Sequence, residues 1–482
     1  MTKIANPSPE QQAFFDAVTN GKSSLLLEAV AGSGKTSTLV HALELMRGQI
    51  FFGAYNKKIA DEIKSRVPAG RTGIFVSTMH AAGFSAWRRA APKVKVDDRK
   101  CLRLTEHMGI AVPAVNVTCS LVSLAKQAAF GVLNSVDDDS EWYRLIEHFN
   151  IDLSDNDPKV IVTGAKELLK ASIATDSATI DFDDMIYAPL VHKARVFEHD
   201  WVLIDEAQDT NASRRALALR LLKRGGRLIA VGDPHQAIYG FTGADADSLG
   251  LIGAAVNAQR MSLSVSYRCP RAVVEHAQQY VHHIAAAPGA PEGVVRTGTS
   301  KEVAIGDVVL CRFNKPLISL AFEMIAAGKP AKVEGRDIGN GLKALARKWK
   351  VRSLADLATR LETYVERETA KLRAKEKESA AVAVEDKVGC LMFLLRRTQS
   401  ADKELPDLLA EIDSLFADDA DPTKMIILSS IHKSKGKEWH RVFWLQTGPS
   451  PWARKDWELE QENNLLYVAT TRAQRELVLI GN

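Results

Sequence analysis

Two short stretches carry residue types suited to binding and splitting a nucleoside triphosphate. Ala29–Thr36 reads AVAGSGKT, and Trp201–Thr210 reads WVLIDEAQDT. A glycine-rich turn between a strand and a helix N-terminus presents backbone N–H groups to phosphate oxygens. An Asp–Glu pair at the end of a strand can hold Mg²⁺ and accept a proton from water. Together the stretches indicate an NTPase, but not yet what the hydrolysis drives.

Side-chain chemistry predicts a role for each polar residue in these stretches. Lys35 would reach the β- and γ-phosphates, while the Thr36 hydroxyl and Asp205 would ligate Mg²⁺. Glu206 is the candidate general base for the attacking water. Ala29 stands where the usual pattern starts with Gly, a mild departure because two later glycines still let the backbone approach the phosphates. The other expected nucleotide contacts are Ala31, Gly32, Ser33, Gly34 and Ser37.

The elements that must position these residues appear as short apolar runs separated by helix-like segments. Buried strands that alternate with helices predict an α/β fold with parallel sheets. The predicted strands are Ser24–Ala29, Ile50–Tyr55, Ile74–Thr78, Trp201–Ile204, Arg227–Val231, Val308–Arg312, Met425–Ser429, Arg441–Leu445 and Leu477–Ile480.

The predicted strands fall into two groups, and a long, mainly helical stretch splits each group. We therefore expect two α/β domains in tandem, each with an inserted subdomain. The first domain would comprise residues 1–85 and 181–258, with a helical insert at 86–180. The second would comprise residues 259–339 and 422–482, with a shorter accessory insert at 340–421.

Composition excludes several classes of protein. The net charge is +4, and 46% of the 482 residues are hydrophobic, both ordinary for a soluble globular protein. The five cysteines are scattered without a CxxC pair, which argues against a disulfide framework or a structural zinc site. The N-terminus has no apolar run for a signal peptide, and no stretch approaches the roughly 18 apolar residues of a membrane span. We expect a soluble protein of the cytoplasm, associated with the nucleoid, or of another reducing intracellular compartment.

Further ordered motifs resemble those of superfamily 1 helicases, in the branch that contains UvrD, Rep and PcrA. The resemblance spans residues 9–473, and AYNKKIA and VGDPHQ also resemble the F-box DNA helicases. It implies two RecA-like motor domains and dependence on ATP and Mg²⁺. The motifs are PEQQ, AYNKKIADEIKSR, STMHAAGF, DFDDM, VGDPHQAIYGFTGA, LSVSYR, ILSSIHKSKGKEWHRVF and ENNLLYVATTRA.

The resemblance also implies roles for single residues. Gln11 would read adenine through its side-chain amide, Tyr267 would stack on the base, and Glu438 would lie near the ribose. The residues implied at the γ-phosphate are Gln236, as a sensor, and the arginine fingers Arg268 and Arg472. The implied contacts to a single strand are Tyr55, His80, Tyr239, Phe241, Asn314 and His432, with Phe241 as the base-stacking platform.

The sequence thus predicts a translocase that moves 3′-to-5′ on single-stranded DNA and separates duplex at single-strand/double-strand junctions. Polarity comes only from the resemblance. Thr242, Ser266, Asn463 and Asn464 depart from the family pattern and could weaken coupling between the ATP and strand sites. The segment after Ala473 is too short for a C-terminal nuclease or docking module. Alternatives are a protein-stripping translocase that unwinds poorly, an ATP-switched binding module, and RNA as the track.

Overall fold

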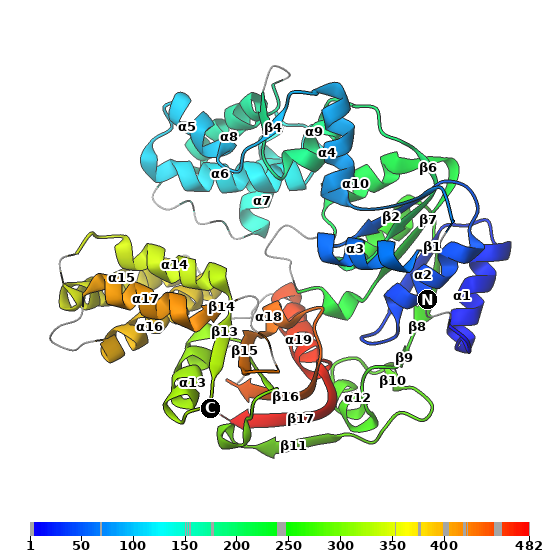
Figure 1. Ribbon diagram of the computed structural model, residues 1–482. Coiled ribbons are helices and arrows are strands. Elements are labelled where there is room, and N and C mark those ends of the chain that lie inside the picture. The colour runs from blue at the N-terminus through cyan, green and yellow to red at the C-terminus, as the bar shows by residue number, and fades with distance from the viewer. Residues whose placement is uncertain are drawn as a thin grey trace. The chain divides into compact units, whose positions relative to one another are not determined.

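The computed structural model describes residues 4–67, 70–149, 151, 153, 156–174, 178–238, 247–351, 353–374, 377–398, 404–417, 421, 423–447 and 456–481. The chain divides into two compact units, Met1–Ser264 and Val265–Asn482 (Figure 1). Among the described helices, none combines the length and apolar character needed to cross a bilayer.

The first unit is built on a six-stranded parallel sheet with the strand order β3-β2-β6-β7-β1-β8. The strands are β1 (Leu25–Ala29), β2 (Ile50–Ala54), β3 (Ile74–Thr78), β6 (His199–Ile204), β7 (Leu222–Gly232) and β8 (Gln259–Leu263). All five residues of β2 are buried, as expected for a strand covered on both faces. The carboxyl ends of all these strands therefore lie at one edge of the sheet, where ligands bind in open α/β folds.

Helices cover both faces of this sheet and supply two separate apolar cores. Phe14, Leu39 and Ile63 belong to the core on one face, and Met79 and Leu217 belong to the core on the other. The helices of the first face are α1 (Pro9–Asn20), α2 (Lys35–Leu45) and α3 (Lys57–Arg66). Those of the second face are α4 (Met79–Ala90), α9 (Asp184–Val191), α10 (Ala212–Leu221) and α11 (Ser248–Ala255).

The insert of the first unit is a helical subdomain with its own core. Its core includes Leu121, Trp142 and Leu168, which are fully buried. A short parallel pair, β4 (Lys95–Val96) with β5 (Thr179–Ile180), joins the two ends of the insert. The helices are α5 (Lys100–His107), α6 (Val112–Gln127), α7 (Asp139–His148) and α8 (Pro158–Ser172).

A buried charge cluster ties this insert to α9. The fully buried Lys126 ammonium lies 2.5 Å from Asp181 Oδ2 and 2.8 Å from Asp184 Oδ1. Lys100, also buried, lies 2.6 Å from Asp184 Oδ2. Burial alone would lower the pKa of Lys126, but the carboxylates of Asp184 and Asp181 raise it above its ordinary value. Lys126 therefore keeps its positive charge in the folded protein.

Replacement of Lys126 by Met should destabilise the first unit by about 3–5 kcal/mol, because it leaves two buried carboxylates short of a cation. Urea unfolding followed by circular dichroism measures this loss. Lys170→Met is the matched control, because Lys170 pairs with Asp137 at the surface. A loss no larger than that of the control would show that the cluster contributes little to stability.

The second unit contains a seven-stranded parallel sheet with the order β11-β17-β16-β12-β15-β13-β14. Its strands are β11 (Val294–Gly298), β12 (Val308–Cys311), β13 (Ala331–Glu334), β14 (Phe416–Ala417), β15 (Ile426–Ser430), β16 (Trp439–Gln446) and β17 (Ala473–Gly481). The helices that lie outside the accessory insert in this unit are α12 (Arg271–Ala277), α13 (Asn314–Ala326), α18 (Ile431–Ser434) and α19 (Asp456–Thr470).

The accessory insert of the second unit shares one core with the sheet. Leu357 and Leu391 of the insert belong to the same buried cluster as Val309 and Leu428 of the strands. This insert is therefore an extension of the sheet's cover rather than a separate lobe. Its helices are α14 (Arg336–Arg347), α15 (Leu354–Ala374), α16 (Glu378–Thr398) and α17 (Leu405–Leu415).

The α/β fold with parallel sheets in both halves is confirmed, and every run predicted as a strand overlaps one. In the two large sheets, strands β8, β11, β13 and β14 were not predicted. The sequence of β8, QRMSL, is polar and largely exposed at the sheet edge. This strand pairs with β1 of the first sheet, so Gln259–Ser264 lies in the first unit and not in the second domain as predicted.

Candidate nucleotide and nucleic-acid sites

The residues between β1 and α2, with Lys35 and Thr36 of the first turn of α2, form the predicted phosphate-binding segment, which we term the phosphate loop. Gly32 and Gly34 have positive φ angles of 75° and 79°, a conformation that glycine adopts without strain. Ser33 is 1% exposed, and its hydroxyl has no hydrogen-bond partner in the described part of the chain. The first N–H groups of a helix have no partner within it, so the start of α2 beside an unsatisfied buried hydroxyl fits an anionic ligand such as a triphosphate.

The two predicted Mg²⁺ ligands lie next to each other. The Thr36 hydroxyl donates to Asp205 Oδ2 over 3.3 Å, although the strands that precede the two residues in the chain, β1 and β6, are separated by β7. Lys35 donates from Nζ to the Ala29 carbonyl at 3.2 Å, so the ammonium lies over the loop. The loop residue Ala31 is fully buried, and Ser37 accepts a hydrogen bond from Arg66 of α3 at 2.9 Å. The donor set of one hydroxyl and one carboxylate suits Mg²⁺, which keeps several water ligands.

Asp205 is an acid whose ionised form is destabilised in the folded protein. Burial raises its pKa to about 7, the negative charge of Glu206 adds to this, and Lys35 opposes it. Since the folded state then binds a proton more tightly than the unfolded state, stability should fall as pH rises from about 4 to about 7. A cation bound beside Asp205 would remove this penalty.

Asp205→Asn should therefore abolish ATP hydrolysis yet leave the protein at least as stable as the wild type at pH 8 in EDTA. The neutral amide carries no desolvation cost of a buried charge. Thermal unfolding between pH 5 and pH 8 tests this, with Asp200→Asn as the control carboxylate at the surface. A lower melting temperature for Asp205→Asn at pH 8 would contradict the raised pKa.

Glu206 begins a hydrogen-bonded chain that runs across the ends of β6 and β7. Glu206 has a left-handed backbone with φ 51°, a strained conformation for a residue other than glycine. Gln208 donates from Nε2 to Glu206 Oε2 at 2.5 Å and accepts from the Asp233 backbone N–H at 3.1 Å. Gln236 donates to Asp233 Oδ2 at 2.7 Å. The candidate base and the predicted γ-phosphate sensor are thus joined through two intermediate side chains.

Gln208 was not among the predicted site residues. It is 2% exposed, and its amide satisfies groups on both the Glu206 turn and the β7 turn. The signal in the sequence is an amide side chain two residues after Glu206, in a turn with no other reason to bury one.

Gln11 lies beside the phosphate loop, as its predicted adenine contact requires. Its side-chain oxygen accepts from the Ser8 backbone N–H at 3.0 Å, and its Nε2 donates to Thr38 Oγ1 at 3.1 Å. A Cβ placed on Gly34 would lie 3.8 Å from this Nε2. The same glutamine therefore caps α1 and lies against the loop that would carry the nucleotide.

The first unit brings together two of the predicted strand contacts. Burial raises the pKa of Tyr55 to about 12, and Asp209 adds to this while Arg214 opposes it. Burial, with the charge of Arg214, lowers the pKa of His80 to about 4, so the imidazole is neutral near pH 7. Both rings thus share Arg214 of α10 as a neighbour, a cation that was not predicted. Tyr239 and Phe241 lie outside the described residues.

In the second unit, two predicted nucleotide contacts pair with each other. Arg268 forms an ion pair with Glu438, which also accepts from Gln474 Nε2 at 2.8 Å. The adjacent Tyr267 is 51% exposed, so its ring is available for stacking on a base. A ligand that binds the Glu438 carboxylate in place of Arg268 would release the Arg268 guanidinium.

Arg472 differs sharply from Arg268 in its surroundings. It is 1% exposed, and its guanidinium donates to the carbonyls of Val468 and Lys437, at 3.0 Å each, and to Thr471 Oγ1 at 3.1 Å. These bonds join the end of α19 to the turn before β16. Arg472 therefore has a structural role in addition to any contact with phosphate.

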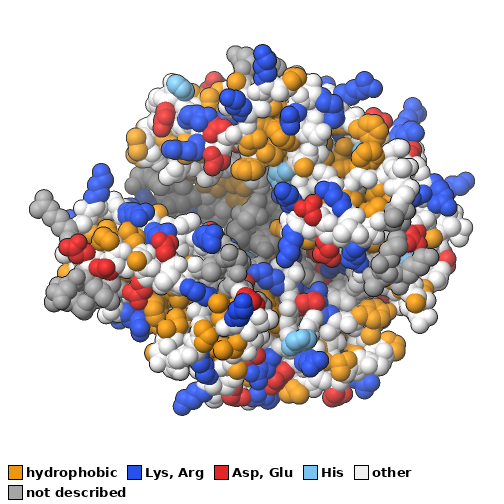
Figure 2. All heavy atoms as spheres, viewed as in Figure 1, with side chains coloured by type: hydrophobic (Ala, Val, Ile, Leu, Met, Phe, Trp, Pro, Cys, Tyr) orange, Lys and Arg blue, Asp and Glu red, His pale blue; other side chains and the backbone are white. Residues whose placement is uncertain are grey.

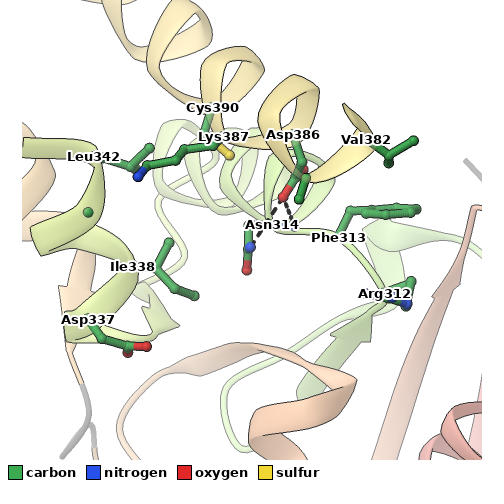
Figure 3. Close-up of a pocket in the computed structure, with 12 residues that line it drawn as sticks. Arg312, Phe313, Asn314, Asp337, Ile338, Leu342, Val382, Asp386, Lys387 and Cys390 are labelled. Atoms are coloured by element: carbon green, nitrogen blue, oxygen red, sulfur yellow. Dashed lines mark hydrogen bonds between the residues drawn. The ribbon is translucent and has the colours of Figure 1, made fainter. Parts of the chain in front are cut away.

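Asn314 lies at a cavity of about 360 Å³ in the second unit (Figure 3). Its backbone N–H and side-chain Nδ2 both donate to Asp386 Oδ2 at 3.2 Å, so a carboxylate from α16 caps the start of α13. Asn314 Oδ1 is buried without a partner in the described part of the chain. His432, the other predicted strand contact of this unit, has its pKa lowered to about 3 by burial and by Arg312 and Lys435. Asp386 was not predicted, because it lies 72 residues from Asn314 in the chain.

Positive charge is not gathered into one patch on the face shown in Figure 2. Lys and Arg side chains are dispersed there and interleaved with Asp and Glu. This agrees with the small net charge of +4.

Comparison with known protein families gives two matches. Residues 9–252 match the model of the UvrD/REP helicase N-terminal domain, and residues 331–482 match that of the UvrD-like helicase C-terminal domain. The chain belongs to the UvrD/REP helicase family. The resemblance drawn from the motifs is thereby confirmed.

Individual relatives are named as DNA helicases. The chain is 25% identical to F-box DNA helicase protein 1 of Schizosaccharomyces pombe, over 98% of this chain and 57% of that protein. It is 26% identical to the ATP-dependent DNA helicase PcrA of Bacillus subtilis, over 58% of this chain and 40% of that protein. PcrA of Leuconostoc citreum gives the same three values. The chain thus spans between two fifths and just over half of the length of these relatives.

Proposed function

We propose that the protein is an ATP-dependent DNA helicase that moves 3′-to-5′ along single-stranded DNA and unwinds duplex at junctions. The observation that carries this proposal is the chain of contacts from Thr36 and Asp205 through Glu206 and Gln208 to Gln236. In a member of the UvrD/REP family, this chain joins the candidate Mg²⁺ ligands to the turn that precedes the predicted stacking residue.

The residues of the first unit would bind the nucleotide and prepare a water molecule. Mg²⁺ would supply charge neutralisation at the phosphates, held by Thr36 and Asp205. Lys35 and the loop N–H groups would bind phosphate oxygens, and Gln11 would orient the adenine. Glu206 would take the proton of the attacking water, with its carboxylate oriented by Gln208.

The second unit would contribute charge and stacking. Tyr267 would stack on the adenine and Glu438 would bind near the ribose. Arg268 and Arg472 would stabilise negative charge at the γ-phosphate, an effect on the order of 10³-fold or more. Gln236 would sense whether the γ-phosphate is present and couple this to the strand contacts.

Strand binding would use aromatic faces that accept any base. Phe241 and Tyr239 would stack bases, and each stack is worth about 1–3 kcal/mol. Tyr55, His80, Asn314 and His432 would supply further contacts along the strand. Because stacking is tolerant of sequence, these contacts suit a motor that must pass every base.

The form of the accessory insert favours a second candidate, a translocase that displaces proteins and unwinds weakly. This insert packs into the core of its sheet instead of forming a lobe of its own. Strand displacement on duplexes with 3′ or 5′ single-stranded tails, measured beside displacement of a bound protein, separates the two candidates and tests the polarity.

The central experiment measures ATP hydrolysis with single-stranded DNA, single-stranded RNA or no nucleic acid. The wild type should be stimulated by DNA, and Phe241→Ala should lose most of that stimulation while its basal rate remains. Tyr143→Ala, an exposed aromatic of the helical insert, is the matched control. Equal rates with and without DNA would overturn the motor proposal, and preference for RNA would identify the other track.

A further inference from the structure

A group of aromatic side chains lies at the amino-terminal ends of the strands of the first unit. The ring centroids of Phe75 and Phe197 are 5.7 Å apart, and His199 lies 5.3 Å from the first and 5.1 Å from the second. The ring of Phe51 packs against His199, with the two rings tilted and their centroids 5.5 Å apart. With small residues of α4, these rings line a hollow of about 330 Å³, which we term the aromatic groove.

Folding leaves two of these rings uncovered. Phe75 is 46% exposed and Phe197 is 56% exposed, whereas Phe51 and His199 form the buried floor. Burial lowers the pKa of His199, so the floor carries no charge near pH 7. Contiguous exposed aromatic surface of this kind marks an interaction site more often than chance.

The wall of the groove formed by Val196 and Phe197 also lines a second, open depression of about 880 Å³. Its charged residues are Lys193, Arg195, Arg220 and Arg224, with Glu198 as the lone acid, and we term this set the basic flank. None of these four cations makes an ion pair with a carboxylate in the described part of the chain. Arg220 donates instead to the carbonyls of Pro189 and Ala194, at 2.8 and 2.9 Å.

Strand β3 adds a third feature to this surface. It is the edge strand of the sheet and, among the described strands, pairs only with β2. Its outer edge can therefore offer backbone N–H and C=O groups to an extended segment. Phe75 lies on this strand, so a segment paired with the edge would pass beside the groove.

This surface is separate from the predicted nucleotide site within the same unit. The phosphate loop, Asp205 and Tyr55 follow the carboxyl ends of β1, β6 and β2, while Phe75 and His199 lie at the amino ends of β3 and β6. In a parallel sheet these two ends lie at opposite edges. A partner on the aromatic groove would thus leave the nucleotide site open.

We propose that the aromatic groove and the basic flank form a docking site for a peptide segment of a partner protein, one that carries a bulky apolar side chain next to carboxylates. The hollow is sized for one or two side chains, and the flank supplies the complementary charge. A nucleic acid is disfavoured, because four of the five cations at this surface lie on the flank and only Arg89 lines the aromatic groove itself.

The test begins with random peptides displayed on phage. They are selected on the wild-type protein and counter-selected on the Phe75→Ser/Phe197→Ser double variant. Survivors should carry an aromatic or large aliphatic residue beside Asp or Glu. A fluorescein-labelled survivor is then titrated by anisotropy. Phe197→Ala should weaken its binding about tenfold or more, as expected for an interface hot spot.

Charge reversal tests the flank independently. Arg195→Glu with Arg224→Glu should weaken the same peptide strongly at low salt and less at high salt. The matched controls are Val160→Ala, 62% exposed on α8, and Lys159→Glu beside it, which should leave the affinity unchanged. Every variant should keep the wild-type ATPase rate, which shows that it is folded.

Two outcomes would overturn the proposal. One is a selection that yields no peptide dependent on Phe75 and Phe197, or yields only basic peptides. The other is a set of groove variants that weaken binding of a labelled oligothymidylate instead of the peptide, which would assign the surface to the nucleic-acid track. The proposed helicase activity is tested by its own assay of ATP hydrolysis and strand displacement.

Discussion

Glu206→Gln should lower the kcat of DNA-stimulated ATP hydrolysis by about 10²–10⁴-fold, the range expected for loss of a general base. The change keeps the side chain's size, and the new amide oxygen can still accept the hydrogen bond from Gln208. The affinity for ATP should therefore stay near that of the wild type, as should the melting temperature. Steady-state kinetics and binding of a fluorescent ATP analogue measure the two quantities.

Glu28→Gln is the matched control for this experiment. Glu28 lies on β1, one residue before the phosphate loop, and pairs with Arg260 away from the predicted chemistry. Its amide variant should hydrolyse ATP at the wild-type rate. If Glu206→Gln retained the rate of this control, Glu206 would not be the base, and the proton would have to be accepted elsewhere.

Arg268→Ala should lower kcat on the order of 10³-fold with little effect on stability. The Arg268 side chain is 24% exposed and pairs with the half-exposed Glu438, and exposed ion pairs contribute only about 0–1 kcal/mol to folding. Steady-state ATPase assays and thermal unfolding, run on the same preparations, separate catalysis from stability. Arg271→Ala, which removes a nearby surface cation, is the control for charge.

Two further variants distinguish the proposed role of Arg268 from those of Glu438 and Arg472. Glu438→Gln removes the partner of Arg268 and should raise KM without a comparable loss in kcat, because its proposed contact is to the ribose. Arg472→Ala should lower both kcat and the melting temperature, since three hydrogen bonds of a buried guanidinium are lost. A wild-type kcat in Arg268→Ala would show that no charge from this residue reaches the γ-phosphate.

Local pattern was enough to predict much of the fold. The strand at Leu25–Ala29 is an apolar run interrupted only by Glu28 and followed by glycines, and that combination of run and turn is visible without any knowledge of distant residues. The same holds for Trp201–Ile204 and its two acids. Strand β8 was missed because an edge strand exposed to water lacks the apolar run that marks buried strands.

The sequence by itself determined the phosphate loop, the acidic pair and the family, because each depends on residues close together in the chain. Only the tertiary structure decided which distant side chains support them. Gln208 reaching Asp233, Asp386 capping Asn314 and Lys126 neutralising two aspartates all depend on contacts between elements. Such contacts form when strands and helices pack, and no local spacing specifies them. The role proposed for the exposed rings of Phe75 and Phe197 likewise depends on the fold, because the fold places these rings beside the cations of the basic flank.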